Sequence, residues 1–385
     1  MDKNIFSPTF KVGVLGGGQL GKMLALAAGN WHVQLHLLDK SKDFPAGPYS
    51  PEFVEGDFNK YEDVLQFGRS VDVLTIEIEH VNTEALLQLE QEGVIVHPNA
   101  RSLMVIKDKG LQKQFYFDQK LPTSPCLFYD DASDLNKALD SGKLELPFVQ
   151  KSRTAGYDGK GVAVIRTAAD LSKLLDGPCI VEPLVDIDKE IALVAARNPS
   201  GQIEVFPPVE MLFHPVANLV EFLQCPATIS DDQLKQAEAI VRSTIEAFDI
   251  CGLLAVELFL TKSGTWLINE VAPRPHNSGH HTIDSCYTSQ FEQHLRGILD
   301  LPLGSTKMKT PSVMINLLGE AGFTGDAIYE GMDTVLAIPG AKVHLYGKSQ
   351  TKPFRKMGHA TLLDETLEGA VEKAKKVKNI LKIKA

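Results

Sequence analysis

The sequence predicts an α/β protein of three units, and three observations carry this prediction. Strand and helix signals alternate through the first hundred residues, which favours a parallel sheet covered by helices. The chain has 385 residues, more than one domain of about 150 residues holds. Hydrophobic residues make up 44% and charged residues 23%, as in globular proteins, so a disordered, collagen-like or coiled-coil chain is excluded.

The elements of the first unit are read from short apolar runs and the glycines between them. Strands are expected at residues 11–15, 33–38, 71–78 and 94–96, and helices at 19–28 and 82–92. Between the first strand and helix, Gly16 to Gly21 fit G-x-G-x-x-G, and Asp39 follows 18 residues after Gly21. This resembles the Rossmann dinucleotide fingerprint, in which a helix N-terminus faces a phosphate. Taken alone, the motif leaves NAD, another phosphate ligand and a structural turn open.

The second and third units follow a proline-rich break at residues 121–125. In the second unit we expect strands at 148–151, 161–165, 179–182, 190–196, 253–260 and 266–271, and a helix at 231–248. A smaller C-terminal unit begins near residue 300, with strands near 313–317 and 342–346 and a helix from about 367 to 378.

Charge and cysteine content exclude several classes of partner. The formal net charge of −10 argues against binding nucleic acid by bulk attraction to phosphates. The five cysteines are scattered, with no C-x-x-C pair, which predicts reduced thiols in the cytoplasm. No apolar run approaches the ~18 residues that a membrane span needs, so no membrane contact is expected.

A second glycine-rich segment joins two strands of the middle unit. Lys151 ends one strand, and a loop of alternating glycines precedes the next: Gly156, Tyr157, Asp158, Gly159, Lys160 and Gly161. Such a hairpin can fold backbone N–H groups over phosphates, with Lys151 as a point charge. The spacing differs from Walker A, and an ordinary hairpin is the alternative. Further on, Glu190 has the acceptor that a ribose needs, although a solvent-facing strand acid is the favoured explanation when the residue is taken alone.

A pair of carboxylates gives the strongest signal for chemistry. The apolar strands at 253–260 and 266–271 flank Ser263 and Gly264, which suggests a two-residue hairpin loop. In that register Glu257 lies opposite Glu270, with Cβ atoms about 5 Å apart on one face. A divalent cation would relieve their repulsion, and oxygen ligands suit Mg²⁺. The register is an assumption, and an exposed acid pair is the alternative.

Two polar segments complete the candidate sites. Directly after the second acid strand, Arg274, Asn277 and Ser278 suit an anion or substrate clamp. His276 and His280 have the spacing of a helical zinc pair, but Pro275 and Gly279 make a poor helix. The basic residues around Lys348 and Arg355 form either a solvated hairpin tip or a site for an anionic substrate.

Together these features resemble the ATP-grasp superfamily, and within it the N5-carboxyaminoimidazole ribonucleotide synthetase family of purine biosynthesis. The motifs are GGGQLG at 16–21, EIEH at 77–80, TAGYDGKG at 154–161, NEVAPRPHNSGH at 269–280, SQFE at 289–292, PSVMINL at 311–317 and RKMGH at 355–359. The resemblance implies an ATP-grasp fold with a Rossmann-like pre-ATP-grasp domain (1–108), an ATP-grasp domain (109–300, lid subdomain about 125–185) and a small C-terminal domain (301–385). It implies a cytoplasmic, homodimeric C–N ligase.

The implied reaction uses ATP, bicarbonate and 5-aminoimidazole ribonucleotide, with Mg²⁺ or Mn²⁺ held by Glu257 and Glu270. Implied ATP-binding residues are Lys109, Lys151, Gly156, Tyr157, Asp158, Gly159, Lys160, Gly161, Glu182, Pro183, Leu184, Val185, Glu190, His214, Asn269 and Glu270. Implied substrate-binding residues are Gly18, Gln19, Leu20, Glu79, Arg274, His276, Asn277, Ser278, Lys348 and Arg355. Asp158, Arg274 and Lys348 are the implied catalytic residues, and the glycine loop is expected to act as a mobile lid.

The sequence departs from the family pattern at two positions, and four alternative functions stay open. Lys109 stands where Arg is frequent, and Ala155 where a second Gly is usual. Lys keeps the charge but loses the two-pronged guanidinium. The rivals are a formate-dependent glycinamide ribonucleotide transformylase, a biotin carboxylase, a nicotinamide oxidoreductase and a non-catalytic nucleotide-binding regulator.

Overall fold

The N-terminal unit is a five-stranded parallel sheet. The structure is a computed structural model that describes residues 4–154, 161–213 and 220–385. The strand order is β3-β2-β1-β4-β5, and all neighbours are parallel. The strands are β1 (Lys11–Leu15), β2 (Gln34–Asp39), β3 (Glu52–Glu55), β4 (Val73–Ile76) and β5 (Ile95–His97). The predicted parallel sheet is confirmed, and the short edge strand β3 is an addition to it.

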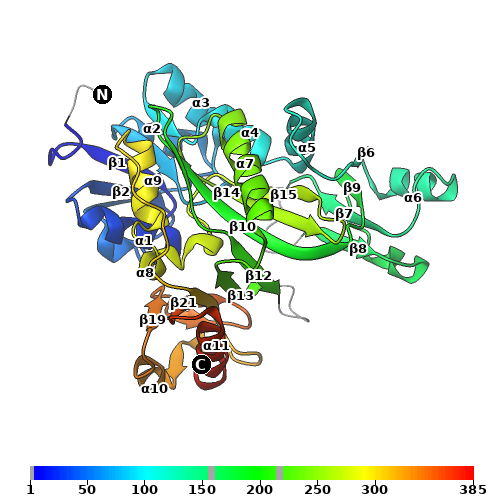
Figure 1. The fold of residues 1–385 in the computed structure, drawn as a ribbon. Helices are drawn as coiled ribbons and strands as arrows, with labels where there is room; N and C mark the ends of the chain where they lie inside the picture. Colours follow the sequence, from blue (N-terminus) through cyan, green and yellow to red (C-terminus); the bar gives the residue numbers. More distant parts are fainter. Residues whose placement is uncertain (1–3, 155–160, 214–219) are drawn as a thin grey trace.

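Helices cover both faces of this sheet. One face carries α1 (Gln19–Gly29) and α9 (Gln290–Ile298), which share a core with Val12 and Leu35. The other face carries α2 (Tyr61–Gly68), α3 (Thr83–Gln91) and α4 (Ala100–Ile106). Figure 1 shows α9 beside the N-terminal strands although it lies far along the chain. The strand order reverses between β1 and β4, where the carboxyl ends of parallel strands open a crevice for ligands.

A four-stranded antiparallel sheet follows the linking helix α5 (Lys109–Asp118). Its order is β6-β9-β7-β8, with β6 (Leu127–Tyr129), β7 (Phe148–Ser152), β8 (Val162–Ile165) and β9 (Cys179–Pro183). The helix α6 (Ala132–Asp140) and the 3-10 helix η2 (Ala168–Lys173) belong to the same unit. Their side chains bury Phe148 and Val181 in a small core of their own.

The largest sheet has nine strands and joins the middle of the chain to its C-terminal part. Its order is β15-β14-β10-β12-β13-β16-β21-β19, with β11 paired beside β10. Because β13 pairs with β16, the C-terminal strands extend the middle sheet. The strands are β10 (Ile187–Arg197), β11 (Ile203–Val205), β12 (Val209–Phe213), β13 (Val220–Cys225), β14 (Gly252–Thr261), β15 (Trp266–Ala272), β16 (Ser312–Leu318), β19 (Ala341–Leu345) and β21 (Lys356–Leu363).

Two amphipathic helices cover this sheet. The helix α7 (Asp231–Ala247) begins at Ser230, whose capping box with Gln233 satisfies free N–H groups of the first turn. The helix α11 (Leu367–Ile380) buries a stripe of small residues against β16 and β21. The remaining elements are η1 (Gly47–Tyr49), η3 (Asn277–Gly279), α8 (Thr282–Ser285), β17 (Gly325–Asp326), β18 (Ile328–Glu330), α10 (Met332–Leu336), β20 (Gln350–Thr351) and β22 (Lys382–Lys384). Over the ranges that the structure describes, none of the helices has the length and apolarity to cross a membrane.

Candidate active site

The hairpin of β14 and β15 brings the two predicted metal acids together. Glu257 pairs directly with Glu270, as predicted. The predicted two-residue loop is wrong: Thr261 N donates to Thr265 O at 2.9 Å, so three residues form the turn, with Gly264 at φ +83°. The longer turn shifts the register by one residue, and a β-bulge at Asn269 shifts it back. The two irregularities cancel, and the acids face each other.

The environment of the acid pair favours a bound cation. Burial raises the pKa of Glu257 to about 8, and the charges of Glu270 and Glu190 add to this rise. Burial opposes ionisation of Glu270 as well, but Lys109 outweighs it and lowers that pKa, with Nζ 2.6 Å from Oε2. In the described part of the chain no cluster of three or more His, Cys, Asp or Glu residues could hold a metal by itself. Two carboxylates alone fit a Mg²⁺ site whose remaining ligands are substrate phosphates and water.

Lysines from two other elements face the acids. Lys151, the fourth residue of β7, donates to Asn269 Oδ1 at 2.9 Å and pairs with Glu182 at 2.8 Å. Glu182 is also paired with Lys113 of α5. Burial raises the pKa of Glu182, but the two lysines outweigh it and hold the pKa below its usual value. The site therefore contains lysines and carboxylates in close pairs, which places positive charge beside the two acids.

The segment after β9 supplies the predicted adenine and ribose positions. Pro183 ends β9, and Ile187 N donates to Val185 O at 3.1 Å in the turn that leads to β10. On β10, burial raises the pKa of Glu190 to about 7, and the charge of Lys151 partly opposes this. Glu190 is thus held beside the lysine that faces the acid pair. This places Lys151 of β7 beside predicted nucleotide residues of β10 and β15.

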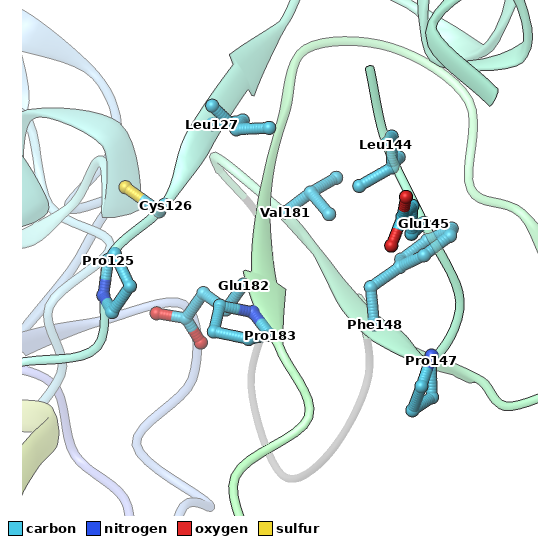
Figure 2. A pocket seen from close by; sticks show the side chains of 10 residues that line it. All are labelled: Pro125, Cys126, Leu127, Leu144, Glu145, Pro147, Phe148, Val181, Glu182 and Pro183. Atoms are coloured by element: carbon cyan, nitrogen blue, oxygen red, sulfur yellow. The ribbon is translucent and has the colours of Figure 1, made fainter. Parts of the chain in front are cut away.

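A mostly apolar cavity of about 260 Å³ lies next to these residues and includes Glu182 in its lining. Figure 2 shows its walls on β6, β7 and β9, with Glu182 pointing to the opposite side of β9 from Val181. The lining residues are Pro125, Cys126, Leu127, Leu144, Glu145, Pro147, Phe148, Val181, Glu182 and Pro183. Neither of the paired acids lines the cavity, so it is separate from the candidate metal position.

The N-terminal glycine motif is occupied by the protein's own carboxylates. Glu77 accepts from Gly18 N at 2.6 Å and from Gly21 N at 2.5 Å. Asp39 accepts from Gly17 N at 2.7 Å. These N–H groups are the donors that a dinucleotide would need for its pyrophosphate. The geometry therefore disfavours the nicotinamide reading of the motif.

Two of the predicted substrate residues, Arg274 and His276, contact acids of the first and middle units. Arg274 forms an ion pair with Glu79 at 2.7 Å, and His276 Nε2 lies 3.7 Å from Glu257. Burial lowers the pKa of His276 to about 4, with Arg274 and Lys356 contributing, so this imidazole is neutral at pH 7. The charge of Lys356, from the basic C-terminal segment, therefore acts on His276.

The remaining predicted substrate residues hold local structure. Lys348 Nζ donates to Lys356 O at 2.8 Å, and Arg355 Nη1 donates to Gln350 O at 2.6 Å. His276 Nδ1 lies 2.9 Å from Ser278 Oγ, and Asn277 begins η3. Ser278 is buried.

Comparisons with known proteins agree with this arrangement over nearly the whole chain. Family models match at residues 9–107 (ribonucleotide synthetase preATP-grasp domain), 114–291 (ATP-grasp domain) and 312–373 (phosphoribosylaminoimidazole carboxylase C-terminal domain). The N5-carboxyaminoimidazole ribonucleotide synthase of Synechococcus elongatus is 38% identical, and the match covers 97% of this chain and 94% of that protein. The chain belongs to the N5-carboxyaminoimidazole ribonucleotide synthase family.

Solved structures of the synthase family share the fold. The synthetase from Thermotoga maritima has a TM-score of 0.90 at 40% identity, covering 98% of this chain and 99% of that one. The Aspergillus clavatus synthase in complex with ADP and 5-aminoimidazole ribonucleotide has a TM-score of 0.88 at 31% identity, covering 97% and 99%. The chain also matches the chloroplastic phosphoribosylaminoimidazole carboxylase of Vigna aconitifolia at 38% identity, but spans only 64% of that longer protein. The predicted ATP-grasp fold is confirmed.

Some family residues predicted from the motifs lie outside the described ranges. These are Gly156, Tyr157, Asp158, Gly159, Lys160 and His214. Gly161, the last glycine of the loop, is described at φ +74°, and its carbonyl accepts from Ser152 N at 2.8 Å. The roles assigned to all site residues from the family resemblance stay predictions.

Other residues of this synthase-family site were missed by sequence reasoning. Lys113, on the same face of α5 as Lys109, carried no motif, although its spacing of four residues on a helix would have suggested it. Arg153 and Asp108 form a two-pronged ion pair, with nitrogen–oxygen distances of 2.9 and 2.7 Å. Glu77 stood inside the EIEH motif, but only the structure shows that it faces the glycine loop.

Proposed function

We propose that this chain uses ATP to join bicarbonate to the exocyclic amine of 5-aminoimidazole ribonucleotide. The products are N5-carboxyaminoimidazole ribonucleotide, ADP and phosphate, in purine biosynthesis. The observation that supports this most is Glu257 facing Glu270 beside Lys109 and Lys151. A related synthase of the same fold was solved with ADP and 5-aminoimidazole ribonucleotide.

On the nucleotide side, the residues act by positioning and charge. Phosphoryl transfer needs little covalent help from the protein, so alignment and neutralisation of charge dominate catalysis. We propose that Lys109 and Lys151 give up their contacts with Glu270 and Glu182 in part and take phosphate oxygens. The turn at Glu182, Pro183, Leu184 and Val185 would hold the adenine, and Glu190 the ribose hydroxyls. Lys151 already contacts Asn269 and acts electrostatically on Glu190, which supports this assignment.

On the substrate side, the proposed chemistry has two balanced steps. A bicarbonate oxygen attacks the γ-phosphorus, the bond to ADP breaks, and carboxyphosphate forms. The amine nitrogen then attacks the carboxyl carbon, phosphate leaves, and the amine loses a proton. We propose that Gly18, Gln19, Leu20 and Glu79 receive the ring and ribose, with Arg274, His276, Asn277 and Ser278 beside the reacting carbon. Lys348 and Arg355 would meet the 5′-phosphate, and Asp158 and Lys348 would lie nearest the bicarbonate.

Magnesium is the cation that the donor set fits, with Mn²⁺ as a substitute. Glu257 and Glu270 offer only oxygen ligands. Burial raises the pKa of Glu257, and the charges of Glu270 and Glu190 add to this rise. When bound, the metal would neutralise charge on the phosphates. His276 is neutral at pH 7 and leaves that task to the lysines and the metal.

The deciding experiment measures ADP release with and without each substrate. We expect ADP to form only when ATP, bicarbonate and 5-aminoimidazole ribonucleotide are all present. Formate-dependent turnover of glycinamide ribonucleotide, or biotin carboxylation, would favour a rival of the same superfamily. Equal ADP release without the ribonucleotide, or none at all, would contradict the proposal.

A second experiment tests the acid pair. Glu270→Gln keeps the shape of the side chain but removes a negative charge from the proposed metal site. We expect kcat to fall about 100-fold or more, with an unchanged melting temperature. Glu246→Gln on the exposed face of α7 is the matched control and should retain wild-type activity. Near wild-type turnover in Glu270→Gln would exclude the pair from catalysis.

We also propose the assembly and setting of the enzyme. The division into 1–108, 109–300 and 301–385 is supported by the three matching family models. A homodimer and a cytoplasmic location are proposed from the resemblance and from cysteines that are unpaired in the described structure. The partners are small molecules, and neither nucleic acid nor a membrane is proposed.

A further inference from the structure

We propose that Glu77 is a positioning residue that takes the place of a phosphate at the glycine loop and orients the ribonucleotide. In this view its carboxylate holds residues 18–20 in the shape that receives the base and ribose. It also keeps the 5′-phosphate of the substrate away from the loop, on the side of Lys348 and Arg355. This inference rests on the proposed function and adds a residue that the family resemblance did not assign.

The contacts of Glu77 place it at the centre of the crevice between β1 and β4. The residue directly follows β4, and its backbone N–H donates to Leu15 O at 3.0 Å at the end of β1. Its side chain reaches across to the loop, where its two oxygens accept from Gly18 N and Gly21 N at 2.6 and 2.5 Å. Two N–H groups aimed at two oxygens are the geometry of an ionised carboxylate at a helix N-terminus. This is the position of the phosphate in dinucleotide-binding folds.

The glycines of the motif leave room for this carboxylate. A Cβ placed on Gly16 would lie 2.3 Å from Cγ of Glu77, and one placed on Gly18 would lie 2.6 Å from its Oε1. Contacts under about 3 Å force a neighbour to shift, so a side chain at either position would displace the Glu77 carboxylate, and Gly16 also has φ +111°. The same spacing that permits close approach of a pyrophosphate here permits close approach of a side chain.

A second carboxylate strengthens the negative field at the loop. Asp39, 5% exposed, accepts from Gly17 N at 2.7 Å, so three glycine N–H groups of the motif are bound to acids. Burial raises the pKa of Glu77, while its hydrogen bonds from Gly21 and Gly18 oppose that rise. A dianionic phosphate brought to this loop would meet two buried acids and no free donor at Gly17, Gly18 or Gly21. Uncharged ring and hydroxyl groups carry no such penalty.

Glu77 also links the loop to the next substrate segment. Two residues later, Glu79 forms the ion pair with Arg274. The short stretch after β4 therefore makes two contacts: Glu77 holds the glycine loop, and Glu79 holds Arg274. The charge of Lys356, the neighbour of Arg355, acts on His276, two residues after Arg274.

The test separates positioning from simple stabilisation. Glu77→Gln keeps the side-chain volume, but its amide can accept only one of the two N–H bonds, and its NH₂ group opposes the other donor. We expect KM for 5-aminoimidazole ribonucleotide to rise about tenfold (about 1.4 kcal/mol), while KM for ATP stays within twofold. Asp72→Asn is the matched control, because Asp72 accepts a backbone N–H from Lys11 at the opposite end of the same strand, at 2.9 Å. Asp72→Asn should lower the melting temperature by about as much as Glu77→Gln does, and it should leave both KM values unchanged.

A second measurement tests the orientation. The riboside that lacks the 5′-phosphate is used as a competitive inhibitor against the ribonucleotide. In Glu77→Gln both should weaken by the same factor, because the loop contacts the part that they share. In Arg355→Ala only the ribonucleotide should weaken.

The outcomes distinguish the two proposals. Absence of ribonucleotide-dependent ADP release in the wild type would overturn the proposed function. A normal wild type combined with an unchanged KM in Glu77→Gln, or equal rises in both KM values, would overturn the role of Glu77 alone. A selective loss of ribonucleotide over riboside in Glu77→Gln would place the phosphate at the loop and likewise contradict the orientation.

Discussion

At the scale of single residues, Glu257 makes a prediction about metal binding. With a pKa of about 8, this carboxyl carries a proton at pH 7 in the metal-free protein. A divalent cation binds the deprotonated form, so binding must displace that proton. We therefore expect Mg²⁺ binding to release protons at pH 7 and to weaken as the pH falls from 8 to 6. Calorimetry in buffers of different ionisation enthalpy measures both effects, and pH-independent binding would contradict the prediction.

The same residue makes a second prediction, about stability without metal. A carboxyl whose folded pKa exceeds its unfolded value stabilises the protein at low pH. This contribution is lost as the pH rises from the unfolded value of 4.5 to about 8. In EDTA, Glu257→Gln should therefore flatten the fall in melting temperature between pH 5 and pH 8. Glu246→Gln should show the same dependence of melting temperature on pH as the wild type.

The role of a residue was predictable where its partners lie close to it in the sequence. The facing of Glu257 and Glu270 was read from two apolar strands and one short turn. The turn is one residue longer than expected, but the bulge at Asn269 restores the register, so the predicted pairing is correct. Neither irregularity was visible in the sequence. Glu77 could not be assigned, since its partners Gly18 and Gly21 lie more than fifty residues away in sequence. Only the order of strands in the parallel sheet brings them together.

At the scale of elements, the N-terminus of α5 makes a prediction about ATP binding. Asp108 caps the helix by accepting from Gly110 N at 2.7 Å, and it pairs with Arg153 at the end of β7. Lys109 N in turn donates to Arg153 O at 2.8 Å. These contacts fix the backbone of Lys109, whose ammonium faces Glu270. Asp108→Ala should lower the free energy of unfolding by about 1–2 kcal/mol and raise KM for ATP several-fold.

A second helix cap provides the control for that experiment. Asp131 caps α6 by accepting from Asp134 N at 2.9 Å, on a helix outside the set of elements that carry the acids and lysines. Asp131→Ala should cost similar stability, measured by urea unfolding, and leave KM for ATP unchanged. Equal changes of KM in both variants would mean that α5 acts only through global stability.

Some elements could be predicted from the sequence and others could not. Strands with continuous apolar runs, such as β1 and β14, were predicted because burial on both faces leaves that pattern. The helix α9 carried the SQFE motif, but its packing against the N-terminal sheet was not predicted, since nothing local shows which sheet an amphipathic helix covers. The strands β12 and β13 were missed because both are short, and a glutamate at the second position of each interrupts the apolar run.

At the scale of the whole molecule, the continuous nine-stranded sheet makes a prediction about truncation. The C-terminal unit extends the middle sheet through the pairing of Phe222 with Ile315 and of its neighbours. A chain that stops at residue 300 would expose the edge of β13, and exposed edges promote aggregation. We expect this truncated chain to aggregate in gel filtration. We also expect one cooperative calorimetric transition for the middle and C-terminal parts of the full chain; two resolved transitions would contradict this.

The same sheet has a geometric consequence for the two ligands. The proposed metal acids lie on β14 and β15, near one edge, while Lys348 follows β19 at the other. Hydrogen-bonded strands run without interruption between them, so the separation of the nucleotide from the substrate phosphate is a fixed dimension of the scaffold. Any closure around the reaction must then come from elements outside the sheet. Substitutions in β12 or β13 would change the distance between the bound nucleotide and the ribonucleotide without contacting either ligand.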